Sequence, residues 1–173
     1  MCDVIGSSDY FWHYTDVHYD PTYETTQESC NVNVSDSPFG SYECDSPWRL
    51  VVSSVNAMKR IGPKPAFIVW SGDTVHHPKN PKDLSREKVI EVMKNLTTLL
   101  RTTFPGVAVF PCLGNHDYFP HNQFPARDNA YYGGLSQLWR PWLRETDAGV
   151  TFTQGRFLDD FALPFLPEGM RKY

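Results

Sequence analysis

A continuous apolar run, Ala66 to Trp70 (AFIVW), is the feature that most constrains how this chain folds. An uninterrupted apolar segment of this length predicts a strand buried on both faces, as in parallel sheets covered by helices. Ser71, Gly72 and Asp73 follow the run and supply turn residues that end the strand. The run therefore predicts a central parallel strand with a carboxylate beyond its carboxyl end.

Two further strands and two helices are predicted around this run. Tyr10 to Thr15 is aromatic and β-favouring, and Val107 to Phe110 is a short apolar segment. Between the strands, apolar residues recur at helical spacing from the N-cap Ser46 to Gly62, and from the N-cap Ser85 to about Arg101. The order strand, helix, strand, helix, strand favours an α/β fold with helices packed on a mainly parallel sheet.

Polar motifs follow each of the three predicted strands. Asp16-Val17-His18 follows the first strand, Gly72-Asp73 the second, and Gly114-Asn115-His116-Asp117 the third. Carboxylate, imidazole and amide groups bind metals or transfer protons, and parallel strands bring such groups together beyond their carboxyl ends. Each motif alone has an ordinary alternative, such as a capping Asp, a surface His or a polar turn. Three motifs in the same place relative to their strands instead predict one shared site.

These motifs resemble those of the calcineurin-like metallophosphoesterase family, whose signature runs D-x-H, then G-D, then G-N-H-[DE]. The segments FWHYTDVHYDPTY, SGDTVHHP and FPCLGNHDYFPHNQFPA look like the acid sphingomyelinase-like phosphodiesterase group. We expect residues 10–157 to form the N-terminal half of the metallophosphoesterase α/β sandwich, between an extension of residues 1–9 and a divergent tail of residues 158–173. Leu135 to Leu143 predicts a further short helix, bent or interrupted by Pro141.

The resemblance implies a site for two zinc ions. Asp16 and His18 are expected to hold one ion, Asp73 to bridge both ions, and Asn115 to bind the second. Zinc ions held in this way lower the pKa of water and stabilise charge on phosphate oxygens, which is the chemistry of a phosphoric ester hydrolase. The expected enzyme is therefore a metal-dependent phosphodiesterase.

His116 and His77 are the histidines to which the resemblance gives catalytic roles. His116 is expected to contact the phosphate or to protonate the leaving group, and His77, four residues after the bridging Asp73, is a second candidate general acid. The expected substrates are small nucleotide phosphates, phosphodiesters or phospholipid head groups. A net charge of -4 gives no basic excess for a nucleic-acid polymer, and no apolar run approaches the roughly 20 residues of a transmembrane helix.

Cysteines and glycosylation sequons bear on the compartment. Cys30 and Cys44 flank a polar loop, and their spacing alone leaves a disulfide and two separate thiols open. The family resemblance implies the disulfide. Sequons at Asn33 and Asn95 are compatible with N-glycosylation. The resemblance implies a secreted, extracellular or lysosomal glycoprotein, although residues 1–9 lack the basic start and apolar stretch of a signal peptide.

The sequence departs from the family pattern after His121, which is its last histidine. The family completes its metal site with a later Gly-His and a Gly-His-x-His, and this sequence contains neither. Two alternatives to an active phosphodiesterase therefore stay open. One is a truncated, catalytically inactive isoform or gene-model fragment, and the other is a secreted non-enzymatic interaction domain.

Overall fold

The computed structural model describes residues 10–23, 36–78, 80–125 and 130–142 of the 173-residue chain. The chain divides into two compact units, Met1–Gln123 and Phe124–Tyr173. The described strands all belong to the first unit, together with two α-helices, and the second unit has one described helix. None of the helices in the described ranges has both the length and the apolar character needed to cross a membrane.

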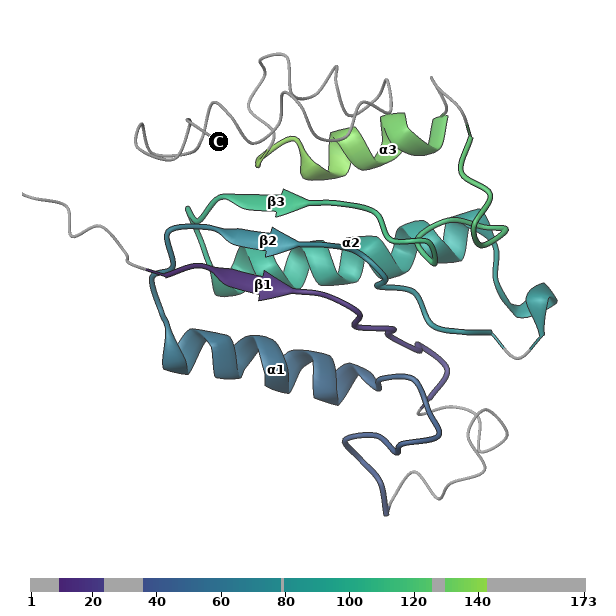
Figure 1. Cartoon of the computed structure of the whole chain (residues 1–173), viewed down its shortest axis with the longest axis horizontal. Coiled ribbons are helices and arrows are strands. Elements are labelled where there is room, and N and C mark those ends of the chain that lie inside the picture. The colour runs from purple at the N-terminus through teal and green to yellow at the C-terminus, as the bar shows by residue number, and fades with distance from the viewer. Residues whose placement is uncertain (1–9, 24–35, 79, 126–129, 143–173) are drawn as a thin grey trace, which may run out of the picture. The chain divides into compact units, whose positions relative to one another are not determined.

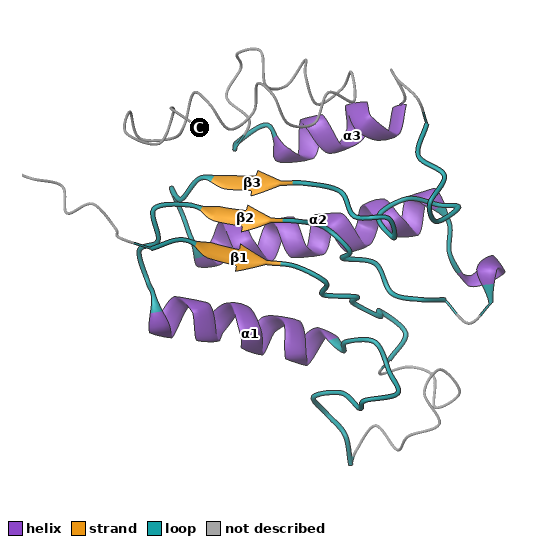
Figure 2. Cartoon of the chain, viewed as in Figure 1, coloured by secondary structure: helices purple, strands orange, loops and turns teal. Residues whose placement is uncertain are grey.

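A three-stranded parallel sheet forms the centre of the first unit (Figure 1). Its strands lie in chain order: β1 (Trp12–Tyr14), β2 (Ile68–Trp70) and β3 (Val109–Pro111). Figure 2 shows the three arrows pointing the same way, so the carboxyl ends of the strands meet at one edge. Ile68 and Trp70 of the middle strand are fully buried. The predicted α/β fold with a parallel sheet is confirmed.

Two amphipathic helices make the crossovers between the strands. They are α1 (Trp48–Ile61) and α2 (Arg86–Thr103), and a 3₁₀ turn, η1 (Pro81–Asp83), precedes α2. Each helix buries residues three and four positions apart: Val51, Val55 and Met58 of α1, and Val89, Val92, Met93, Leu96, Thr97 and Leu100 of α2. The two helices contact each other, as expected when successive right-handed crossovers place them on the same side of a sheet.

Capping residues explain where the helices begin and end. Ser85 caps α2 as predicted, because its hydroxyl accepts a hydrogen bond from the Lys88 backbone N–H at 3.3 Å. Gly62 ends α1 as predicted. The prediction that Ser46 caps α1 is wrong, because the N-cap is Pro47 and no side chain caps the helix. The backbone of Ser46 is instead paired with the segment after β1, through His18 and Asp20.

The helix of the second unit, α3 (Ala130–Trp139), begins earlier than predicted and ends before Pro141. Its buried residues, Tyr131, Tyr132, Leu135 and Trp139, follow helical spacing. The pair Gly133-Gly134 hides that spacing in the sequence, because glycine is a poor helix former. The predicted end of the helix at Leu143 lies outside the described residues.

Replacing Leu100 with Ala should destabilise the first unit by about 2–5 kcal/mol, because a fully buried leucine leaves a cavity when it is truncated. Ile61→Ala is the matched control, since it removes the same number of carbons from a helical side chain that is 78% exposed. Its effect should stay within about 0.5 kcal/mol. Urea unfolding followed by circular dichroism measures both. Equal losses in the two variants would contradict the packing of α2 described above.

Candidate metal centre

The segments that follow β1 and β2 run side by side beyond the sheet. Their backbones remain paired after the strands end: the Asp16 N–H donates to Gly72 O at 3.1 Å, and the His18 N–H donates to Asp73 O at 3.0 Å. The parallel pairing that joins β1 to β2 therefore continues into the polar motifs. It brings residues that are more than fifty positions apart in the sequence to one place.

Three residues of these segments have left-handed backbone conformations. The φ angles are 53° at Asp16, 41° at His18 and 50° at Asp73. Residues with a Cβ occupy this region at a cost of order 1 kcal/mol or more each, and they persist there only where the surrounding structure holds them. Such strain gathers at functional sites, because it aims side chains that regular structure would point elsewhere.

Asp16, His18 and Asp73 form a group that could hold a metal ion, which we call the carboxylate group. Each offers one ligand atom, and the three atoms lie within 4.8 Å of one another. His18 Nε2 is 3.9 Å from Asp16 Oδ1, and Asp73 Oδ1 accepts a hydrogen bond from the His116 N–H at 2.9 Å. One nitrogen and two carboxylate donors suit Zn²⁺, Mn²⁺ or a similar divalent ion.

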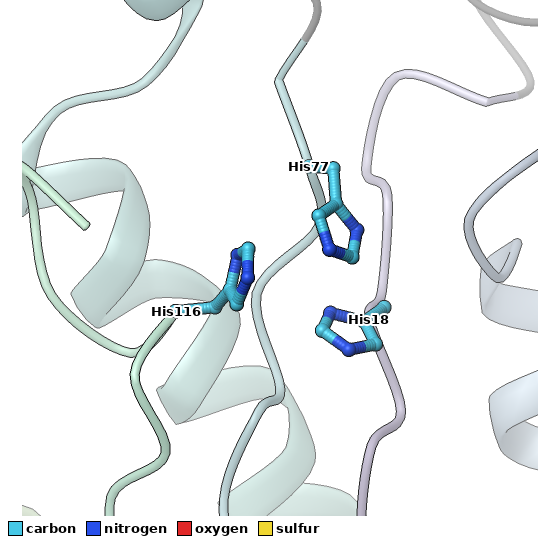
Figure 3. Close-up of side chains that lie close together, drawn as sticks. All are labelled: His18, His77 and His116. Carbon is cyan, nitrogen blue, oxygen red and sulfur yellow. The ribbon is translucent and has the colours of Figure 1, made fainter. Parts of the chain in front are cut away.

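His18, His77 and His116 form a second group, the imidazole group, which shares His18 with the first (Figure 3). Figure 3 shows the three rings converging from three separate backbone segments. The ring centroid of His77 lies 4.4 Å from that of His18 and 4.2 Å from that of His116. One ligand atom from each ring again falls within 4.8 Å of the others. The structure thus brings both predicted catalytic histidines to the predicted metal ligands.

The structure does not test the roles predicted for Asn115 and for the modification sites. Asn115 lies beside His116 in the turn after β3 and is exposed, so its role as a ligand stays a prediction. Cys30 and Asn33 lie outside the described residues, so the pairing of Cys30 with Cys44 stays a prediction as well. Asn95 is half-buried in the middle of α2.

Asp117 is a site residue for which no role was predicted. Its buried carboxylate accepts hydrogen bonds from the backbone N–H groups of Thr74 at 2.7 Å, Val75 at 3.3 Å and Gly114 at 2.9 Å. Burial raises the pKa of Asp117 to about 6, although these hydrogen bonds oppose the rise. The carboxylate ties the segment after β2 to the segment after β3. Its place in the Gly-Asn-His-Asp motif was the available signal.

Asp45 and His121 were also missed. Asp45 holds His77 at two points: Oδ2 accepts from the His77 backbone N–H at 2.6 Å, and Oδ1 accepts from ring Nδ1 at 3.0 Å. The ring of His121 lies 4.3 Å from that of His116. Asp45 is 32 residues from His77, and no spacing in the sequence relates them. Only the folded arrangement identifies these two residues.

Gly72 and Gly114 allow the segments after β2 and β3 to approach each other closely. A Cβ on Gly72 would overlap the backbone of Gly114 and would lie 2.7 Å from the carbonyl carbon of Leu113. A Cβ on Gly114 would overlap both the backbone nitrogen and the carboxylate of Asp73. Because the obstructing atoms are mostly backbone, a larger residue at either position would displace Asp73.

Three histidines near the site have lowered pKa values. Burial is the largest cause for His76, His116 and His121, and neighbouring histidines, chiefly His77 and then His18, lower the pKa of His116 further. The neutral imidazole is therefore favoured in the folded chain. Neutral imidazole is also the form that binds metal ions.

Comparison with known proteins supplies independent evidence on the family. The model of the calcineurin-like phosphoesterase family matches residues 10–167. The chain is 43% identical over 155 residues to human acid sphingomyelinase-like phosphodiesterase 3b, covering 85% of this chain and 34% of that protein. It is 41% identical to human cyclic GMP-AMP phosphodiesterase, with the same coverage of both proteins. It is 34% identical to sphingomyelinase phosphodiesterase C of Dictyostelium discoideum, covering 93% of this chain and 37% of that protein. The chain thus spans about a third of the length of these relatives.

Replacing Gly114 with Ala should destabilise the chain by about 1–3 kcal/mol, because the new methyl group overlaps Asp73. It should also weaken metal binding at the carboxylate group. Gly134→Ala is the control, since nothing lies within 4 Å of a Cβ there and alanine favours the helix. Urea unfolding and metal titration measure the effects. A Gly114→Ala variant as stable as the unsubstituted chain would contradict the close approach.

The lowered pKa of His76 predicts a pH dependence of stability. In the unfolded chain His76 has the ordinary histidine pKa of about 6.5, whereas burial lowers its pKa in the folded chain. The stabilising contribution of neutral His76 is therefore complete above about pH 6.5 and is lost as the pH falls below that value. His76→Gln should show a smaller loss of unfolding free energy between pH 7.5 and pH 5 than the unsubstituted chain. His13→Gln, which alters an exposed histidine, is the control, and equal losses in all three proteins would refute the assignment.

Proposed function

The chain belongs to the calcineurin-like phosphoesterase family, and we propose that it forms part of the active site of a metal-dependent phosphodiesterase that hydrolyses phosphoric diesters. The observation that carries the proposal is the carboxylate group at the carboxyl ends of two neighbouring parallel strands, with its three ligand atoms within 4.8 Å. The left-handed backbone at Asp16, His18 and Asp73 supports a functional reading of the same residues.

Zinc is the ion that we assign to the carboxylate group. The mixture of imidazole and carboxylate donors suits it, and His18 Nδ1 donates to Val75 O at 3.0 Å, an outer hydrogen bond typical of histidines that bind metal. When bound, such an ion lowers the pKa of a water molecule and stabilises charge on phosphate oxygens. We propose that Asp16 and His18 hold a first ion, that Asp73 is shared with a second ion, and that Asn115 is a ligand of the second.

His116 and His77 are the groups that we propose to move protons. His116 is held next to the carboxylate group by the hydrogen bond from its backbone N–H to Asp73. Its pKa is lowered by burial and by its neighbours His77 and His18, so an anionic phosphate in the site would be needed to favour its protonated form. His77 is oriented by Asp45 through its Nδ1, which leaves Nε2 for proton transfer to a leaving oxygen.

The proposed substrates are small phosphodiesters. One relative is named for cyclic GMP-AMP and others for sphingomyelinase activity, so nucleotide phosphodiesters and phospholipid head groups are both candidates for this chain. A secreted or lysosomal location is proposed with them. The supports for that location are the sequons at Asn33 and Asn95 and the predicted disulfide between Cys30 and Cys44.

Replacing Asp73 with Asn should weaken Zn²⁺ binding at least tenfold and lower hydrolysis of bis-p-nitrophenyl phosphate by at least as much. The variant loses a charged ligand of the metal. Even the loss of a residue that only contacts a ligand lowers metal affinity or activity about 10–100-fold. Asp83→Asn removes the same charge from an exposed residue and should change neither quantity. Metal affinity is measured by competition with a chromophoric chelator, and cyclic GMP-AMP and sphingomyelin are tested as alternative substrates. Identical zinc affinity in the Asp73→Asn variant and the unsubstituted chain would overturn the proposal.

A further inference from the structure

We infer that the imidazole group, His18, His77 and His116, is a metal site in its own right that competes with the carboxylate group for His18. It is made of nitrogen donors only, from segments that follow three different strands. Binding at this site does not depend on the proposed function. Its consequence for catalysis does, because two of its three residues are the proposed proton-transfer groups.

The distances suit a small transition-metal ion. The three ligand atoms lie within 4.8 Å of one another. Zinc–nitrogen bonds of about 2.0–2.1 Å place two ligands of a tetrahedral ion about 3.4 Å apart. The nitrogens therefore need to approach one another by at most about 1.4 Å, given the 4.8 Å limit. Rotation of the side chains about their χ angles supplies a movement of this size without a change in the backbone.

Hydrogen bonds already fix two of the three rings in a form that binds metal. His18 Nδ1 lies 3.0 Å from Val75 O, and a carbonyl oxygen only accepts, so Nδ1 carries the proton and Nε2 keeps its lone pair. His77 Nδ1 lies 3.0 Å from Asp45 Oδ1, which leads to the same tautomer. A carboxylate or carbonyl behind the ring is the usual outer contact of a histidine that ligates metal.

His116 supplies a third, independent observation. Its Nδ1 is buried and has no hydrogen-bond partner among the described residues. Buried polar atoms are nearly always paired, and an exception in a folded protein calls for an explanation such as a bound ion. The rings of His18 and His77 are its neighbours, with centroids 5.1 Å and 4.2 Å away. His116 therefore brings a ring nitrogen that no described residue pairs to the same cluster of rings.

The donor set determines which ions the site takes. Neutral imidazoles favour Zn²⁺, Ni²⁺, Cu²⁺ and similar ions, whereas Mn²⁺ and Mg²⁺ prefer carboxylate oxygens. His18 offers a single free nitrogen, because Val75 O occupies the other. One ion at a time can therefore use it. An ion in the imidazole group excludes a His18-bound ion from the carboxylate group and also removes His77 and His116 from proton transfer. Excess Ni²⁺ or Zn²⁺ should therefore inhibit a phosphodiesterase built on this site.

Metal titration of the full chain tests the inference with two ions of different preference. His77→Gln should weaken Ni²⁺ binding at least tenfold and leave Mn²⁺ binding within twofold of the unsubstituted chain. Asp16→Asn should do the reverse. His13→Gln, an exposed histidine outside both groups, should change neither. If His77→Gln leaves Ni²⁺ affinity unchanged, or if Asp16→Asn weakens both ions equally, the inference is overturned.

A measurement on the unsubstituted chain guards against variants that fail to fold. Sub-stoichiometric Ni²⁺, which prefers nitrogen donors, should perturb the side-chain ¹⁵N resonances of His18, His77 and His116 together. Perturbation of His18 without the other two would overturn the inference. Failure of the proposed function has a different signature: Mn²⁺ binding and diester hydrolysis would be absent while the three histidines still respond to Ni²⁺.

Discussion

The buried carboxylate of Asp117 is the contact on which the arrangement of the site depends. It accepts hydrogen bonds from Thr74, Val75 and Gly114, and so holds the segment that carries Asp73 and His77 against the segment that carries His116. An apolar side chain at this position would leave three backbone donors without acceptors, each at a cost of about 1–3 kcal/mol. The carboxylate thus joins the two polar turns beyond the end of the strand ladder, together with the hydrogen bond from the His116 N–H to Asp73.

The site also contains several features that reduce the stability of the folded chain. Three residues are in left-handed conformations, and His76, His116 and His121 each have a buried ring nitrogen without a hydrogen bond among the described residues. The sheet and the two crossover helices, with fully buried residues such as Ile68, Val89 and Leu100, supply the stability that tolerates them. This division is common in enzymes, where a well-packed scaffold supports a strained and polar site.

Much of the fold could be predicted from the sequence because its signals are local. The apolar run at Ala66–Trp70 and the helical spacing after Ser85 identify elements without reference to the rest of the chain. Asp16, His18 and Asp73 could be selected because each follows a predicted strand. Asp45 could not, since its contact with His77 arises from the path of a loop. The N-cap was predicted one residue too early, at Ser46 and not at Pro47, because the backbone of Ser46 is paired with the segment after β1.

The continued pairing of the segments after β1 and β2 has a consequence for how the chain assembles. Asp16 lies opposite Gly72 and His18 opposite Asp73 only in the observed strand register. A slip of β1 by one residue would turn its side chains to the opposite face and separate the ligands of the carboxylate group. An ion that binds only the correctly paired strands would stabilise them over every shifted pairing by mass action. The metal would then select the correct strand register during folding, in addition to any part in catalysis.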